Sequence, residues 1–282
     1  MYGDENNEWQ LDFASLESAL SEKTRMIILN TPHNPTGKVL TVEEMQRISD
    51  LLDKYPRCMV ISDEVYDFLT YGGRKHVPFA TVGNNWYRTV TVYSGGKMLN
   101  CVGWKVGWAI GPQPIVHQAV VINESQQSTN NVPGQVAIAK TLPWYRESRF
   151  DEFMRKNCEE VGETMYEGFK NLSLPIEPLR SEGGYFIVAD VEKCRDLLPK
   201  RFFESNEYED DPHTRIEKID NGLPVGLDLA FTRWMMMEFK VAAIPGSLFY
   251  FPGSRNTTDR YLRFALCRGM NAAKEVLKRL RV

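Results

Sequence analysis

The sequence predicts an α/β protein with a mostly parallel sheet, followed by a smaller α+β domain. In the first half, short apolar runs alternate with amphipathic segments, an order typical of parallel strands joined by helices that cover both faces of the sheet. Beyond Ser148, long helical segments precede short strands, which indicates a different architecture. We place the boundary near Glu147, so that residues 1–147 form a large domain and residues 148–282 a small one.

Local signals set the expected elements of the first half. Thr41-Val42-Glu43-Glu44 is a capping box, whose side chains satisfy the first free N–H groups of a helix that ends before Pro56. Pro112 and Pro133 begin two more helices, because proline is tolerated in a first helical turn. The expected helices span residues 11–20, 41–54, 112–129 and 133–142. The expected strands span residues 26–29, 59–61, 89–93 and 106–110, and the last is a return strand.

The sequence of the second half predicts fewer strands than that of the first half. The expected helices span residues 149–169, 227–239 and 271–280, and the expected strands span residues 185–188 and 261–266. Met235-Met236-Met237 is expected to fill the core on a helix. The acidic stretch 204–211 is the best candidate for a mobile surface loop.

Composition excludes several classes of function. The 282 residues carry 34 basic and 37 acidic side chains, a net charge of −3, which gives no reason to expect a nucleic acid or an anionic membrane as partner. Five cysteines without paired spacing indicate reduced thiols, and four scattered histidines give no zinc motif. No apolar run approaches the roughly 18–20 residues of a membrane span. This composition fits a protein of the cytoplasm or the mitochondrial matrix.

The stretch 94–107 carries the most informative chemistry. Lys97 follows Ser94 by three residues and could form an imine with a carbonyl cofactor. Ser94, backbone N–H groups beside two glycines, and Lys105 could hold a phosphate. The alternative is a glycine-rich turn with two solvated lysines, and the motif taken alone does not decide between the two.

Three more segments carry candidate functional groups. Two prolines make residues 32–37 a rigid turn, from which Asn34 could donate to a ligand oxygen. Asp63 leaves the end of a buried strand, where α/β folds bind ligands, and could pair with a pyridinium nitrogen, while Tyr66 could reach a ring hydroxyl. Arg263 lies between apolar residues of a strand and could hold a carboxylate. The alternatives are a plain turn, a helix N-cap with a packed tyrosine, and a surface cation.

In this order and with these spacings, the four segments resemble the pyridoxal-phosphate aminotransferases of fold type I, class I and II. Within that family the chain is similar to the kynurenine and glutamine aminotransferase group, whose members also act as cysteine-conjugate β-lyases. The resemblance runs from Trp9 to the C-terminus. The supporting stretches are Trp9-Gln10-Leu11-Asp12, residues 29–39, Ser62-Asp63-Glu64-Val65-Tyr66, Gly103-Trp104-Lys105-Val106-Gly107-Trp108 and Ala243-Ile244-Pro245.

The resemblance implies a large cofactor-binding domain, a small C-terminal domain and pyridoxal 5'-phosphate as cofactor. It implies Lys97 as the catalytic imine lysine and proton shuttle, and Arg263 with Asn34 at the substrate. It also implies transfer of an amino group from an aromatic amino acid such as kynurenine, or from glutamine, to a 2-oxo acid, within a homodimer. The implied cofactor contacts are Asn34, Asp63, Tyr66, Ser94, Lys97 and Lys105.

The chain departs from the family pattern at two places. Members carry a substantial portion before the position of Trp9, with an N-terminal arm, a loop that caps the phosphate and an aromatic residue on the cofactor ring. The stretch 197–228 is also longer and more acidic than the usual connection. The sequence leaves open whether the portion before Trp9 is truncated here, belongs to a separate polypeptide, or has been lost from a non-catalytic relic. The alternative function is therefore a catalytically incompetent subunit with a structural or assembly role. We expect the chain alone to dimerise, or to need another chain that covers its apolar surface.

Overall fold

The computed structural model describes residues 2–3, 8–127, 129–204, 225–250 and 259–281. The chain divides into two compact units. The first consists mainly of Trp9–Asn157 with Glu182–Gly184, and the second of Cys158–Ser181 with Tyr185–Val282, as far as these are described. The domain boundary expected at Glu147 stays a prediction, because compactness does not show that a unit folds independently.

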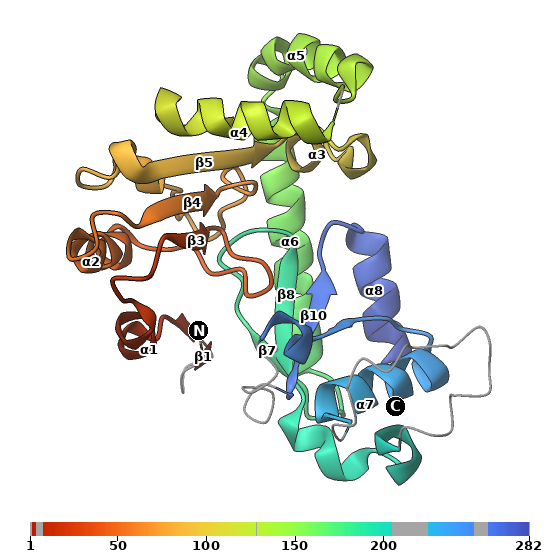
Figure 1. Ribbon diagram of the computed structural model, residues 1–282. Helices are drawn as coiled ribbons and strands as arrows, with labels where there is room; N and C mark the ends of the chain where they lie inside the picture. The colour runs from red at the N-terminus through yellow and green to blue at the C-terminus, as the bar shows by residue number, and fades with distance from the viewer. Residues whose placement is uncertain (1, 4–7, 128, 205–224, 251–258, 282) are drawn as a thin grey trace. The chain divides into compact units, whose positions relative to one another are not determined.

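A four-stranded sheet forms the centre of the first unit (Figure 1). Its strands follow the order β3 (Met26–Asn30), β4 (Met59–Asp63), β5 (Thr89–Ser94) and β6 (Gly107–Ile110). The first three are parallel and β6 runs antiparallel to β5. The predicted mostly parallel sheet and its return strand are therefore confirmed. A two-residue pairing of β1 (Tyr2–Gly3) with β2 (Trp9–Gln10) lies outside this sheet.

Helix α2 (Val42–Asp53) shows how local signals fix an element. The predicted capping box is present: Glu44 N–H donates to Thr41 Oγ1 at 3.1 Å, and Thr41 N–H donates to Glu44 Oε2 at 2.9 Å. The apolar face of α2 packs on β4 in one core. The buried members of that core are Leu20, Leu40, Met45, Ile48, Leu52, Cys58, Val60, Phe79 and Val82.

The other helices of the first unit follow the expected order. They are α1 (Phe13–Ala19), α3 (Gly95–Met98), α4 (Gln113–Gln126) and α5 (Val132–Glu147), before the long helix α6 (Phe150–Lys170). The expected end of α5 at residue 142 is wrong, since the helix continues through Pro143. Tyr145, which is buried, packs edge-on against Phe68 and Phe150, and this packing holds the last turn in place.

A short segment from the second half of the sequence belongs to the first unit. Glu182 N–H donates to the carbonyl of Gly37 at 3.0 Å, and Gly184 N–H donates to the carbonyl of Leu69 at 2.9 Å. The carboxylate of Glu182 accepts from Val39 N–H at 2.8 Å. These contacts attach the segment to the loops that follow β3 and β4.

The second unit contains an antiparallel sheet. Its order is β7 (Glu177–Leu179), β8 (Phe186–Asp190), β10 (Tyr261–Ala265) and β9 (Ile244–Pro245). The predicted strands near 185 and 261 are β8 and β10, whereas β7 and β9 were not predicted because they are only three and two residues long. The predicted helices are the end of α6, α7 (Leu227–Trp234) and α8 (Met270–Arg279).

Short helical turns complete the described chain. The 3-10 segments span Phe79–Thr81, Trp86–Arg88, Val102–Trp104, Glu192–Leu197, Lys200–Phe203 and Gly246–Phe249, and a π-helix spans Met235–Phe239. No helix among the described residues has both the length and the apolar character needed to cross a bilayer.

The expectation for the three consecutive methionines is wrong for two of them. Met235 is fully buried, but Met236 and Met237 are 50% and 46% exposed. Consecutive helical residues point in different directions, so one buried face accommodates only one of the three. The loop expected at residues 204–211 lies outside the described residues except for Glu204.

Gly183 provides a test of the close packing in the first unit. A Cβ atom at this position would lie 2.4 Å from the carbonyl oxygen of Leu69 and 3.0 Å from Val39 Cγ2. We expect Gly183→Ala to lower the free energy of unfolding by about 1–3 kcal/mol, the usual cost of overpacking. Urea denaturation measures the change. Gly103→Ala, where a Cβ would meet nothing within 4 Å, is the control. An equal effect of both substitutions would contradict this packing.

Candidate functional site

The carboxyl ends of β3 and β4 meet at one edge of the parallel sheet. Asn30 lies opposite Asp63 in the register of the two strands. The side-chain amide of Asn30 donates to the carbonyl of Asp63 at 2.8 Å, and its Oδ1 accepts from the N–H of Asn34 at 2.7 Å. Asn30 thus joins the turn that carries Asn34 to the end of the strand that carries Asp63.

The turn after β3 is held by hydrogen bonds, and its histidine, His33, is neutral. His33 Nδ1 lies 2.8 Å from Thr36 Oγ1, and His33 N–H donates to the carbonyl of Lys38 at 2.8 Å. Burial lowers the pKa of His33 to about 4, so the ring is neutral near pH 7. The turn therefore presents Asn34 from a fixed backbone without adding a positive charge.

The carboxylate of Asp63 stands in a partly buried position at the sheet edge. Burial raises the pKa of Asp63, while a hydrogen bond from Val65 N–H and the positive charge of Lys97 act in the opposite direction. The Val65 N–H lies 3.3 Å from Asp63 Oδ1. Asp63 and Lys97 are therefore electrostatically coupled, although 34 positions separate them in the sequence.

Lys97 lies on the short helix α3, directly after β5. Its Nζ is 5.6 Å from the ring centroid of Tyr66, over the ring. Tyr66 is buried, and its carbonyl accepts from Leu69 N–H at 2.8 Å in the loop that follows β4. The structure thus brings together the amine of Lys97, the ring of Tyr66 and the carboxylate of Asp63.

Backbone contacts bring the segment of Lys105 next to α3. Gly95 N–H donates to the carbonyl of Val106 at 3.1 Å, and Ser94 pairs with Gly107 in the β5–β6 register. A Cβ at Gly96 would lie 2.9 Å from the Cα of Val102, so only glycine allows this approach. Lys105 is exposed and has a left-handed backbone (φ 53°). Ser94 and Lys105 therefore flank the start of α3, where the predicted phosphate contacts would be made.

Arg263 belongs to the second unit and lies on β10. It pairs with Val188 on one neighbouring strand and with Ile244 on the other. Its guanidinium lies over two aromatic rings, 4.1 Å from the centroid of Phe186 and 4.8 Å from that of Phe249. Such stacking favours Arg over Lys and keeps the planar group in a defined orientation.

Sequence reasoning did not identify two residues that organise this site. Asn30 forms hydrogen bonds with the backbones of Asn34 and Asp63. The sequence feature that could have identified it is its position at the end of an apolar run, directly before the turn. Glu64 is fully buried beside Asp63 and accepts four hydrogen bonds, one from nearby Ser62 and three from His76, Phe79 and Tyr93, which lie 12 to 29 positions away in the sequence. No local pattern predicts the second arrangement.

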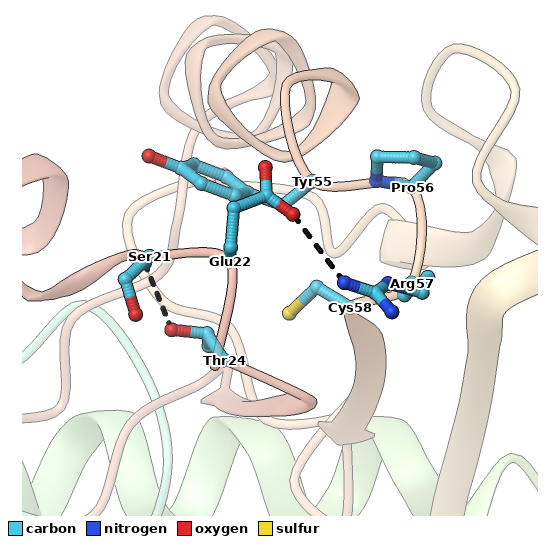
Figure 2. Close-up of a pocket in the computed structure, with 7 residues that line it drawn as sticks. All are labelled: Ser21, Glu22, Thr24, Tyr55, Pro56, Arg57 and Cys58. Atoms are coloured by element: carbon cyan, nitrogen blue, oxygen red, sulfur yellow. Dashed lines mark hydrogen bonds and ion pairs between the residues drawn. The ribbon is translucent and has the colours of Figure 1, made fainter.

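A small depression lies at the other end of the parallel strands (Figure 2). About 160 Å³ of empty space, part of it open to solvent, lies here beside Cys58, which directly precedes β4. Arg57 Nη2 donates to Glu22 Oε2 at 3.5 Å and Ser21 N–H donates to Thr24 Oγ1 at 3.0 Å, so its polar groups interact with each other. Because α/β folds bind ligands at the carboxyl ends of their strands, the candidate site is at Asp63 and not here.

Comparisons with known proteins identify the family of the chain. A family model described as aminotransferase class I and II matches residues 2–280. The chain is 35% identical over 282 residues to kynurenine–oxoglutarate transaminase 3 of Homo sapiens, a match that covers 97% of this chain and 57% of that protein.

Two solved structures are also similar. A putative kynurenine aminotransferase from Saccharomyces cerevisiae has a TM-score of 0.80 and 28% identity, over 97% of this chain and 60% of that one. N-succinyldiaminopimelate aminotransferase from Mycobacterium tuberculosis has a TM-score of 0.78 and 27% identity, over 98% of this chain and 63% of that one. The chain thus spans about three fifths of the length of these relatives. Because the family model matches almost every residue, the chain belongs to the class I and II aminotransferases.

Proposed function

We propose that this protein takes part in pyridoxal-phosphate-dependent transfer of an amino group from an amino acid to a 2-oxo acid. The observation that carries the proposal is the meeting of Lys97, Asp63 and Tyr66 at the carboxyl edge of a parallel sheet. Lysine, aspartate and tyrosine are the groups that can, in turn, attach a carbonyl cofactor, pair with a ring nitrogen and donate to a ring oxygen.

The residues present fit pyridoxal 5'-phosphate by the chemistry of their donors. Asp63 offers a carboxylate to the pyridine nitrogen, while Asn34 and Tyr66 offer donors to the ring oxygen. Ser94 makes no helix-capping hydrogen bond with its side chain, so its hydroxyl is available at the first turn of α3. Together with Lys105, that hydroxyl and the adjacent backbone N–H groups suit a phosphate dianion.

When bound, the cofactor supplies an electron-withdrawing ring that stabilises negative charge at the substrate Cα. Asp63 would keep the ring nitrogen protonated by pairing with it. Lys97 would attach the cofactor and, once released, carry a proton between its Nζ and the substrate Cα as a general acid and base. The aromatic ring of Tyr66, 5.6 Å from that Nζ, limits the volume in which the amine can move.

The substrate class follows from relatives and from Arg263. Relatives named as kynurenine–oxoglutarate transaminases point to an aromatic donor such as kynurenine. Glutamine is a further donor that the family resemblance implies. The guanidinium of Arg263 is suited to hold the α-carboxylate of the donor by two parallel hydrogen bonds, with Asn34 as a second contact. Elimination from cysteine conjugates would use the same stabilised carbanion as a side reaction. The proposed compartment is the cytoplasm or the mitochondrial matrix.

The first unit exposes apolar side chains that favour association with another chain. Ile28 on β3 is 69% exposed, and none of residues 113–126 in α4 is buried. In the sheet as described, β3 and β6 are edge strands with unpaired backbone groups, and Met26 and Ile110 are exposed on them. A homodimer, or a complex with another protein chain, would cover these surfaces.

Lys97→Ala should abolish covalent attachment of pyridoxal phosphate, because no amine would remain at that position to react. Ser94 and Lys105 should still retain the free cofactor weakly. Borohydride reduction followed by peptide mass spectrometry measures attachment. Lys75→Ala, which removes an exposed lysine away from the candidate site, is the control and should behave like the unaltered chain. Cofactor attachment that persists in Lys97→Ala would refute the assignment.

Arg263→Ala should weaken binding of amino acids without changing cofactor content. Loss of two charge-assisted hydrogen bonds corresponds to about 2–3 kcal/mol, or roughly 30–150-fold in affinity. Titration of the cofactor-loaded protein with an amino acid, followed by visible absorbance, measures this affinity. The matched ligand is the amine that lacks only the α-carboxylate, and its binding should not change. Equal losses for both ligands would place the carboxylate contact elsewhere.

The purified chain should not be a simple monomer. We expect sedimentation to show dimers or larger species, because exposed apolar side chains on edge strands promote association. Ile28→Thr should weaken this association, whereas Val42→Thr, which alters an exposed apolar residue on α2, should not. A soluble monomer of 32.4 kDa that unfolds cooperatively would contradict the prediction.

A further inference from the structure

Glu64 is the least expected charged residue of the first unit. It directly follows Asp63, yet its side chain is completely buried. The side chains of Val60 and Ser62 are also buried, so the alternation of β4 continues through Glu64 into the core beside α2. Asp63 therefore points to one face of the sheet and Glu64 to the other. Glu64 does not belong to the set of groups proposed to contact the cofactor.

Four hydrogen-bond donors converge on the Glu64 carboxylate. Oε1 accepts from Ser62 Oγ at 2.7 Å and from Phe79 N–H at 3.1 Å. Oε2 accepts from His76 Nε2 at 2.7 Å and from the hydroxyl of Tyr93 at 3.4 Å. A carboxylate can satisfy all four donors because each of its oxygens is only an acceptor.

The donors come from separate parts of the fold. Ser62 lies on β4, Tyr93 on β5, and Phe79 begins a 3-10 turn that is preceded by the loop of His76. The Nδ1 atom of His76 is buried without a hydrogen-bond partner among the described residues, so the contact with Glu64 fixes the orientation of the ring. One side chain thus fastens two strands and a loop together.

The same residue also begins the loop that carries Tyr66. Glu64 N–H donates to the carbonyl of Val92 at 3.1 Å, and its carbonyl accepts from Asp67 N–H at 3.0 Å. The backbone of residue 64 is therefore fixed on both sides. Asp63 precedes this fixed point by one residue and Tyr66 follows it by two.

We propose that Glu64 is a positioning residue, which holds Asp63 and Tyr66 in place for the cofactor through its four buried hydrogen bonds. This inference rests on the proposed function. Its effect is indirect, because Glu64 faces the core and Asp63 faces the site. Loss of the carboxylate would let the segment 63–67 move and would thereby disturb two proposed cofactor contacts together.

The test compares Glu64→Gln with a control in the same core. Glutamine keeps the shape of the Glu64 side chain but replaces one acceptor oxygen with an NH₂ group. That NH₂ group would face hydrogen-bond donors and cannot accept from them. The control is Ile48→Val or Leu52→Ala, whichever has the same urea midpoint of unfolding as Glu64→Gln. The side chains of Ile48 and Leu52 are both buried in the core beside α2. Tyr93→Phe, which removes only the longest of the four bonds, should give a smaller effect in the same direction.

Two measurements are made on each variant of the 282-residue chain. Amide hydrogen exchange without cofactor reports on the peptide that contains residues 64–71. The equilibrium affinity for pyridoxal 5'-phosphate is then measured by absorbance titration. Glu64→Gln should speed exchange in that peptide and weaken the affinity roughly tenfold, by analogy with the lower end of the effect of residues that orient metal ligands. The control should change neither beyond its general loss of stability.

The outcomes separate the positioning role from the proposed function. If Glu64→Gln and the control have the same exchange in residues 64–71, or the same affinity, the positioning role is overturned. If the unaltered chain does not bind pyridoxal 5'-phosphate through Lys97, the proposed function is overturned instead. The exchange measurement alone then decides whether Glu64 holds the segment.

Discussion

The register between β3 and β4 is the constraint on which the candidate site depends. It places Asn30 opposite Asp63, so that one amide side chain can reach both the carbonyl of Asp63 and the N–H of Asn34. A slip of one residue would exchange the faces of Asp63 and Glu64. The carboxylate of Asp63 would then enter the core, and Glu64 would lose the three donors that come from His76, Phe79 and Tyr93. Pairing and side-chain burial therefore specify the same alignment.

Close approach of the backbone places Lys97 relative to this edge. Helix α3 is a single turn, and its position depends on Gly96, which allows the backbone at Val102 to approach, and on the bond from Gly95 to Val106. These contacts close the segment between β5 and β6 into a compact loop. The charge of Lys97 then acts on Asp63 from a neighbouring strand end. Small residues thus determine where the amine of Lys97 lies.

Elements with strong local signals could be predicted from the sequence. The capping box at Thr41 and the apolar runs of β3, β4 and β5 depend on neighbours in the chain, and the structure confirms them. The segment Glu182–Gly184 could not be predicted, because its hydrogen bonds join residues more than 100 positions apart. For the site, the motifs predicted Asp63, Tyr66 and Lys97, which the structure brings together, while the proposed roles of all the site residues, including Arg263, stay predictions.

Neither local sequence patterns nor stability alone explains why a carboxylate, Glu64, is buried beside the candidate site. Burial of a carboxylate is costly, and well-packed apolar residues in place of a buried charged group together with its polar partners often leave a protein equally or more stable. Stability therefore does not require this polar cluster as a whole, although removal of Glu64 alone would leave its four donors without an acceptor. A carboxylate offers something that an apolar side chain lacks, namely directional acceptors that fix His76, Tyr93 and Phe79 relative to β4. The geometry of the segment that carries Asp63 and Tyr66 thus gives a physical reason for a charge in the core.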